Sequence, residues 1–251
     1  MSPLRGVALV TGSARRIGRV LATALAGAGF DIVAHHHQSH DEVQSLCASL
    51  NALGRQAVAL EADLSQEAQA SGLIERAQAL GPLTVLINNA ALFEDDRIET
   101  LSTDLWRRHM AINLHAPILL SQAFAAALPA PLAGVIINLL DQRVLRPNPQ
   151  FFSYGLSKAA LWSATQTMAQ ALAPRIRVNG IGPGPTLPSI HQSAAQFLAE
   201  AQATPLSRAV DPEQIANAAL YLIDASCVTG QMIAVDGGQH LAWRTPDVSG
   251  P

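Results

Sequence analysis

The stretch VALVTGSARRIG, residues 7–18, joins a short apolar run to a glycine-containing turn and to the start of a segment with helical periodicity. The run predicts a buried strand, Gly12 permits a tight turn, and Gly18 allows close packing of the helix that follows. Such a helix offers N–H groups and the positive end of its dipole to a pyrophosphate. Arg16 replaces the middle glycine of the usual dinucleotide fingerprint, so either the loop holds no dinucleotide or Arg16 contacts the ligand.

The same alternation of short apolar runs and longer helical stretches continues along the whole chain. Strands are expected at residues 7–12, 31–35, 57–63, 83–90, 134–140, 176–184 and 232–238, with helices between most of them. This alternation implies an α/β fold with a doubly wound parallel sheet, right-handed crossovers and helices on both faces. No linker, repeat or low-complexity segment interrupts it, which predicts a single domain over residues 1–251.

Composition limits the possible partners. The 251 residues are 49% hydrophobic and 14% charged, with a formal net charge of -3 and no basic block, so neither nucleic acid nor an anionic membrane is expected as a partner. Apolar runs are strand-sized or broken, and no signal-peptide pattern opens the chain, which predicts a cytoplasmic protein. Cys47 and Cys227 lie too far apart for a zinc site or a disulfide framework and are expected to be buried apolar residues.

The second expected strand ends in HHHQS, residues 35–39, with no acid at its tip. An acid there usually meets the free ribose hydroxyls of NAD, whereas a 2′-phosphate requires donors and positive charge. With Arg15 nearby, His35, His37 and Ser39 favour NADP(H) over NAD(H). A metal site is the rival interpretation, but adjacent strand residues face opposite sides and no acid or cysteine is suitably spaced. Solvated turn histidines are a third.

Two further turns follow expected strands at the same edge of the sheet. Asp63 and Leu64 suit an adenine contact, although an Asp that ends a strand is often a helix cap. Asn88, Asn89 and Ala90 would bring amides beside the ribose.

Residues 138–158, NLLDQRVLRPNPQFFSYGLSK, contain a proton-donor pattern. Tyr154 and Lys158 stand four apart, on one face of a helix, where an ammonium can act on a phenol. Asp141 ends an apolar run at the point where a strand delivers its last side chain to a cleft. A turn cap for Asp141, and a surface pair for Tyr154 and Lys158, are the alternatives.

Five features follow one another along the chain: TG(X)5G at 11–18, NNA at 88–90, Asn113, YxxxK at 154–158 and PGP at 183–185. With these features in this order, the chain resembles the short-chain dehydrogenase/reductase family from end to end. The resemblance implies a Rossmann-type fold, hydride transfer with a nicotinamide cofactor, and a homotetramer or homodimer. It implies that Tyr154 donates a proton, that Lys158 binds the nicotinamide ribose and keeps the phenol acidic, and that Asn113 positions a water. The cofactor residues it implies, together with those above, are Gly12, Arg15, Arg16, Ile17, Gly18, His35, His37, Ser39, Asp63, Leu64, Asn89, Ala90, Tyr154, Lys158, Pro183 and Gly184.

Three departures from the general pattern resemble the pteridine reductase branch and, in part, the dihydromonapterin reductases. Asp141 stands in place of the usual serine, Arg16 in place of the middle glycine, and the second strand ends in histidines. Phe93 is similar to an aromatic that stacks a pterin in that branch; an ordinary core aromatic is the alternative. Gln38 and Ala91 differ from the branch, at positions that contact the 2′-phosphate and the substrate.

The carboxylate at 141 bears on the substrate class. An ionised Asp141 cannot donate to a developing alkoxide, but it can accept N–H bonds or stabilise a protonated ring nitrogen. The sequence therefore predicts NADPH-dependent reduction of a pterin, dihydropterin or folate ring, with Arg16, Phe93, Asp141 and Tyr154 against the substrate. A carbonyl or imine reductase for another substrate is the second hypothesis, and a non-catalytic NADP(H)-binding regulator the third.

Two segments complete the expectations. Residues 185–208 combine prolines with a short amphipathic helix and are expected to form a substrate lid. Trp243 or Arg244, beyond the last strand, would reach a neighbouring subunit's site or be buried in an interface.

Overall fold

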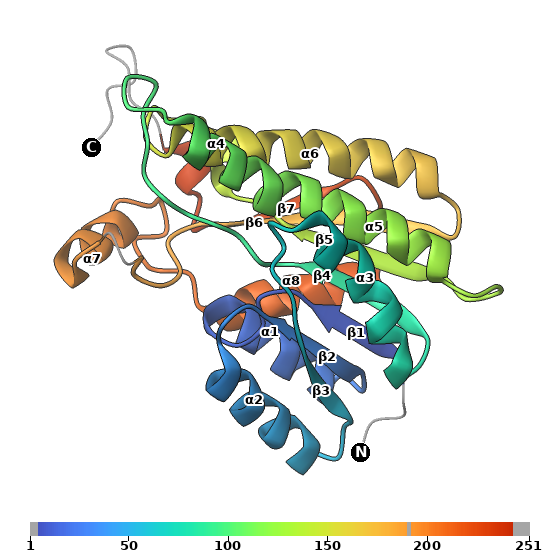
Figure 1. The fold of residues 1–251 in the computed structure, drawn as a ribbon. Coiled ribbons are helices and arrows are strands. Elements are labelled where there is room, and N and C mark those ends of the chain that lie inside the picture. The colour runs from blue at the N-terminus through green and yellow to red at the C-terminus, as the bar shows by residue number, and fades with distance from the viewer. Residues whose placement is uncertain (1–4, 190–191, 243–251) are drawn as a thin grey trace.

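A computed structural model describes residues 5–189 and 192–242. Seven strands form one sheet of order β3-β2-β1-β4-β5-β6-β7, and every neighbouring pair is parallel. The strands are β1 (Val7–Val10), β2 (Asp31–His36), β3 (Ala57–Glu61), β4 (Leu83–Asn88), β5 (Gly134–Leu139), β6 (Ile176–Pro183) and β7 (Met232–Val235). The doubly wound α/β sheet predicted from the sequence is confirmed (Figure 1).

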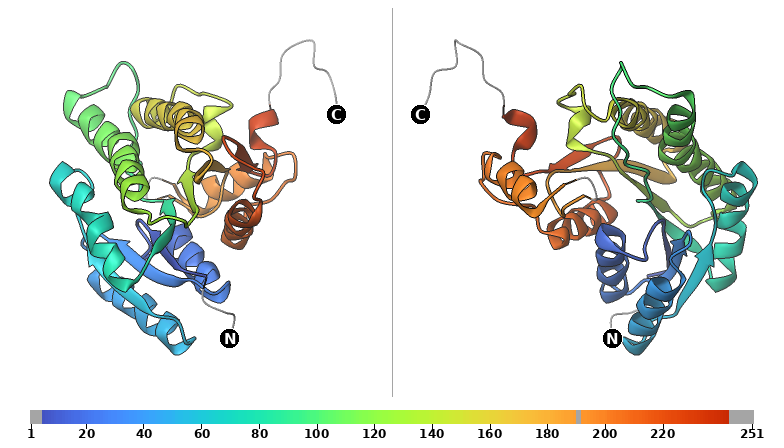
Figure 2. Two further views of the ribbon diagram at one scale, coloured as in Figure 1. Left: turned by 90° about the vertical axis from the view of Figure 1, so that its right-hand side faces the viewer. Right: turned by 60° about the vertical axis from the view of Figure 1, so that its left-hand side comes forward.

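Helices cover both faces of the sheet (Figure 2). They are α1 (Arg16–Gly27), α2 (His40–Ala52), α3 (Glu67–Ala77), α4 (Thr103–Met110), α5 (Ala116–Ala127), α6 (Phe152–Leu172), α7 (Ala194–Gln202) and α8 (Pro212–Asp224). Single turns lie at η1 (Gln78–Leu80), η3 (Gln142–Val144) and η4 (Gln239–Leu241), and a π-helical turn η2 (Ala111–His115) joins α4 to α5.

Two hydrophobic clusters fill the spaces between these layers. Ala8 and Val10 of β1 face a cluster with α1, α2 and α8, whereas Val7 and Leu9 face one with α3 and α5. Successive strand side chains point to opposite faces, so a strand buried on both sides consists almost entirely of apolar residues. The four residues of β1 are all buried, as its sequence predicts.

The order of the sheet reverses between β1 and β4, because the chain crosses back over β1 to continue on its other side. In an open parallel sheet such a switch point opens a crevice beyond the carboxyl ends of the strands. Val10 pairs with Ala34 of β2 and with Ile87 of β4, so the turns after these strands share one edge.

Thr103–Ala127 is long and apolar enough for a membrane span, with a mean hydropathy of 1.3 over its most apolar part. Its Leu120 and Phe124 nevertheless pack into the core, as in a helix that covers a sheet.

Cys47 is buried as expected, whereas Cys227 is exposed, so the prediction of two buried cysteines is wrong for the second.

Candidate functional site

The first turn has the close packing that its glycines predict. Gly12 has a φ of 63°, and a Cβ on Gly18 would lie 2.2 Å from the Gly12 carbonyl oxygen. Arg16, at the middle position, adopts a φ of 52° and so keeps the left-handed backbone that favours glycine. The α1 N-cap, Arg15, provides no side-chain cap, and the first turn holds no acid. The helix N-terminus can therefore receive an anion.

The Arg16 side chain extends away from this turn toward the segment after β6. Its Nη1 donates to the Pro188 carbonyl at 2.9 Å and its Nη2 to the Leu187 carbonyl at 3.1 Å. The guanidinium thus joins the nucleotide-binding turn to the start of the expected lid.

At the tip of β2, Arg15 and Ser39 come together as predicted. Arg15 Nη2 donates to Ser39 Oγ at 2.6 Å, and Nη1 lies 3.5 Å from a Glu42 carboxylate oxygen. Gln38 has a φ of 58°, and His37 is exposed beside it. A guanidinium and a hydroxyl at this tip match the donors that a 2′-phosphate requires.

His35 has a different role from the predicted one. Its Nδ1 accepts from the Gly12 backbone N–H at 3.0 Å, so Nε2 carries the proton and bonds the Ala62 carbonyl at 3.1 Å. Burial lowers the pKa of His35 to about 4, which keeps the ring neutral. Both ring nitrogens are bonded within the protein, so the prediction that His35 contacts the phosphate is wrong. His35 instead supports the turn at Gly12 through the Gly12 N–H.

The other predicted nucleotide contacts also turn toward the protein. Asn89 Nδ2 donates to the Thr11 and Gly12 carbonyls at 2.8 and 3.1 Å, and the Ala90 N–H donates to Thr11 Oγ1 at 2.9 Å. Asp63 Oδ1 accepts from the Ser65 N–H at 2.9 Å in the turn before α3, but the N-cap of that helix is Gln66, so Asp63 is not the helix cap named as the alternative.

Four further predicted cofactor residues are placed by packing. Leu64 is buried in the cluster that also contains residues of α3 and α5, whereas Ile17 of α1 packs against the other cluster. Pro183 ends β6, and Gly184 follows so close to β7 that a Cβ would lie 2.6 Å from the Asp236 Cα.

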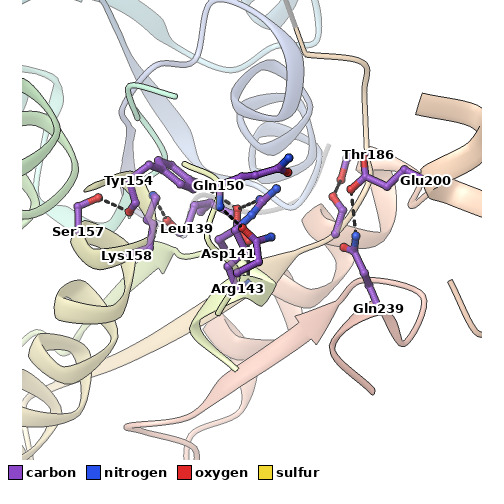
Figure 3. A network of polar contacts seen from close by, with 12 residues as sticks. Leu139, Asp141, Arg143, Gln150, Tyr154, Ser157, Lys158, Thr186, Glu200 and Gln239 are labelled. Carbon is purple, nitrogen blue, oxygen red and sulfur yellow. Dashed lines mark hydrogen bonds and ion pairs between the residues drawn. The ribbon is translucent and has the colours of Figure 1, made fainter. Parts of the chain in front are cut away.

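The predicted catalytic residues meet at the carboxyl end of β5 (Figure 3). Tyr154 Oη donates to Asp141 Oδ2 at 2.9 Å, and Lys158 Nζ donates to the Leu139 carbonyl at 2.6 Å. All three side chains are buried. The Tyr154 hydroxyl and the Lys158 ammonium are therefore both held by β5 and the turn that follows it.

The protonation of this group differs from the prediction that Lys158 keeps the phenol acidic. Burial, followed by the Asp141 charge, raises the pKa of Tyr154 well above its usual value. Burial lowers the pKa of Lys158 to about 8. The ammonium bonds a backbone carbonyl while the phenol bonds a carboxylate, and burial together with this carboxylate keeps Tyr154 protonated.

The Asn113 side chain is bonded within the protein, and its role in positioning a water stays a prediction. Its Nδ2 donates to the Leu92 carbonyl at 2.9 Å and to Ser157 Oγ at 3.1 Å, and its Oδ1 accepts from the Leu92 N–H at 2.8 Å. The π-helical turn η2 directs this side chain inward, as π-bulges often do at functional sites. Asn113 fixes the backbone beside Phe93.

Two residues that the sequence analysis missed complete the site. Phe151 stacks on Phe93 with ring centroids 4.1 Å apart, and the Tyr154 ring meets Phe93 edge-on at 4.7 Å. Arg143 Nη1 lies 3.0 Å from Asp141 Oδ2. The FF pair just before Tyr154 and a base two residues after Asp141 were the available signals.

Comparison with known proteins gives the family. The profile of the family described as Enoyl-(Acyl carrier protein) reductase matches residues 12–240. The chain belongs to the short-chain dehydrogenase/reductase family. It is 31% identical over 239 residues to a 3-oxoacyl-[acyl-carrier-protein] reductase of Synechocystis sp., covering 92% of this chain and 96% of that protein.

Solved structures of this family superpose closely on the chain. FolM alternative dihydrofolate reductase 1 from Brucella canis, in complex with NADP, has a TM-score of 0.94 and 46% identity and covers 98% of each chain. The same protein from Brucella suis, also with NADP, gives the same score and identity, covering 98% of this chain and 99% of that one. The predicted short-chain oxidoreductase is confirmed, and these neighbours carry the predicted cofactor.

Proposed function

We propose that this short-chain oxidoreductase is an NADPH-dependent reductase of a pterin, dihydropterin or folate ring. The observation that carries the proposal is the hydrogen bond from the protonated Tyr154 phenol to the Asp141 carboxylate, at the edge of the aromatic wall formed by Phe93 and Phe151. The 46% identity to a protein described as an alternative dihydrofolate reductase supports the same substrate class.

The donor set fits NADPH. The uncapped N-terminus of α1 suits the pyrophosphate, and Arg15 with Ser39 suits the 2′-phosphate. Lys158, whose Nζ uses one donor on Leu139, has two further N–H groups for the ribose hydroxyls. NADPH bound there supplies a hydride, and the protein's task is to orient the ring and deliver the proton.

Tyr154 is the proton donor in this proposal. Its raised pKa keeps the phenol protonated at neutral pH, which suits reduction, and the bond to Asp141 positions the phenol oxygen. The same O–H turns from the carboxylate to the substrate before the transfer. The proton moves from Tyr154 Oη to the ring nitrogen of the reduced C=N bond. Lys158 does not transfer it, because its ammonium is bonded to the Leu139 carbonyl and 5.8 Å from the phenol ring centroid.

Side chains around Tyr154 would hold the substrate. Phe93 is backed by Phe151 and can stack a planar ring. Arg16, which is bonded to the carbonyls of residues 187 and 188, would contact both cofactor phosphate and substrate, with the 185–208 segment as a lid; its bonds to that segment support this role. Trp243 and Arg244, expected at a neighbouring site, lie outside the described residues.

We also propose that residues 1–251 act as a single cytoplasmic domain assembled into a homodimer or homotetramer. Ile118 of α5 and Leu156 of α6 are large apolar residues exposed in the monomer. Only 33% of the most apolar 18-residue part of Thr103–Ala127 is buried within the subunit, so a subunit contact would cover part of the remainder.

The test is NADPH oxidation with dihydrofolate, dihydrobiopterin, a ketone panel and a 3-oxoacyl thioester. Turnover of the two dihydropteridines, lost by at least about 100-fold in Tyr154→Phe, is expected. Turnover of ketones or the thioester alone would replace the proposal by the carbonyl-reductase alternative. Tight NADPH binding without any turnover would favour a regulatory protein.

A further inference from the structure

Arg143 and Tyr154 share one anchor. Arg143 lies in η3, two residues after Asp141, and its backbone N–H donates to Asp141 Oδ1 at 2.8 Å. Its Nη1 donates to Asp141 Oδ2 at 3.0 Å, and Tyr154 Oη donates to the same oxygen at 2.9 Å. A single carboxylate oxygen therefore holds two donors, one phenolic and one cationic, next to each other (Figure 3).

The guanidinium of Arg143 also faces the aromatic wall. Its central carbon lies 5.6 Å from the Phe93 ring centroid and 5.4 Å from that of Phe151, within the range of cation–π contacts. The side chain is only 17% exposed, so little water reaches it. Arg143 thus borders the surface on which the proposed substrate ring would stack.

Arg143 has a donor left over. Its Nε is buried and has no hydrogen-bond partner within residues 5–189 and 192–242. A buried N–H without an acceptor is unfavourable, and in native proteins such a group often meets a ligand, an ion or a water. Because Arg143 and Tyr154 bond the same oxygen of Asp141, the natural partner is a second acceptor on the molecule that Tyr154 protonates.

We propose that Tyr154 and Arg143 form a two-donor fork that recognises a 4-oxo-dihydropteridine, an inference that rests on the proposed function. In this ring system the imine nitrogen and the carbonyl oxygen lie side by side on one edge. When the ring binds, the single Tyr154 proton turns from Asp141 Oδ2 to the nitrogen, and Arg143 Nε donates to the oxygen, while Phe93 stacks the ring. Asp141 acts mainly as the shared anchor that sets the spacing of the fork.

The chemistry balances with Arg143 as a binding group only. Reduction places a hydride from the reduced nicotinamide on the imine carbon, breaks the C=N π bond and leaves its electron pair on the nitrogen. That nitrogen takes the Tyr154 proton, and the phenolate regains a proton from solvent. Arg143 stays protonated throughout, because a guanidinium does not titrate in proteins.

The fork predicts which ligands are rejected. A simple ketone offers one acceptor and leaves Arg143 unsatisfied. A 4-amino ring, which presents N–H groups where the 4-oxo ring has its carbonyl, places a donor against a donor. Discrimination of this kind arises because a site built for a polar group loses a hydrogen bond when that group changes.

The test uses folic acid and aminopterin, which differ in the 4-oxo or 4-amino group. Binding of each to the protein saturated with NADP would be measured by titration calorimetry for the wild type, Arg143→Met and Arg143→Lys. Arg143→Met is expected to weaken folic acid by about 10- to 100-fold, the value of a charge-assisted hydrogen bond, and aminopterin by less than about threefold. Arg143→Lys, which keeps the charge and loses the planar donors, should give an intermediate loss for folic acid.

Arg146→Met is the matched control, because Arg146 is exposed and its Nη1 bonds the Gln239 carbonyl away from the fork. Equal weakening of both ligands by Arg143→Met, or no change in either, would overturn the fork. Wild-type turnover separates this from the proposed function: a wild type that neither binds folic acid nor oxidises NADPH with dihydrofolate refutes the function itself.

Discussion

Asp96→Asn should destabilise the catalytic helix α6, because Asp96 caps that helix from another part of the chain. The helix's own N-cap residue, Phe151, makes no side-chain cap and has a φ of 53°. Instead, Asp96 Oδ1 accepts from the Ser153 N–H at 3.0 Å, Oδ2 accepts from Ser153 Oγ, and the Asp96 carbonyl accepts from the Phe152 N–H at 3.1 Å. Ser153 Oγ in turn bonds His109 Nδ1 at 2.7 Å.

The magnitude follows from these contacts. Asparagine keeps the shape of Asp96 but removes its charge. Asp96 is 3% exposed, its carboxylate accepts two hydrogen bonds from Ser153, and it lies at the positive end of a helix dipole. Two charge-assisted bonds reduced to neutral strength, with the lost dipole interaction, amount to about 3 kcal/mol. For a domain of this size, that corresponds to a fall of roughly 6–12 °C in the unfolding midpoint.

Thermal and urea unfolding followed by circular dichroism would measure the loss. Asp95→Asn is the matched control, since Asp95 is exposed and caps the same helix end through the Phe151 N–H at 3.2 Å. We expect it to cost less than about 1 kcal/mol. Equal losses in the two variants, or a negligible loss in Asp96→Asn, would refute the buried trans cap.

The remaining predictions concern the site itself. Lys158→Met should remove a pH dependence of stability, because the Lys158 pKa is about 8 in the folded protein and 10.5 ordinarily. Between these two pH values the unfolded wild type binds more protons than the folded one, so the unfolding free energy of the wild type should rise with pH by about 3 kcal/mol relative to the variant. Urea titration at each pH would measure this rise. Asp141→Asn removes a cause of the raised Tyr154 pKa, so the alkaline fall in kcat should move to lower pH. Arg15→Gln should raise the KM for NADPH about 10-fold and leave that for NADH unchanged, whereas Arg19→Gln should change neither by more than about twofold.

The sheet was predictable because its strands are short, apolar and separated by helix-length segments. The residues 7–18 specify a buried strand, a tight turn and a close helix, and the structure has all three. Arg16 shows the physical basis of the fingerprint, because it keeps the backbone conformation of the glycine it replaces while its side chain contacts the segment after β6.

The site was predictable only where a residue's function follows from the element that holds it. Tyr154 and Asp141 fall together because one lies on α6 and the other ends β5. His35 was assigned wrongly because alternation along a strand separates the two faces without saying which face meets the ligand. Arg143 and Phe151 lie in a turn without periodicity, where side-chain direction depends on the local backbone.

The ion pair between Asp141 and Arg143 changes the argument about substrate. From the sequence alone, Asp141 was a bare charge that opposes an alkoxide; in the structure, Arg143 compensates that charge with a backbone and a side-chain bond. The carboxylate then acts through the donors it aligns more than through its own repulsion. Two variants should therefore differ in kind: Asp141→Ser releases both Tyr154 and Arg143, lowering kcat and raising KM for a dihydropteridine, while Arg143→Met releases one and mainly raises KM. Identical effects on both constants would show that Asp141 contacts the substrate without the fork.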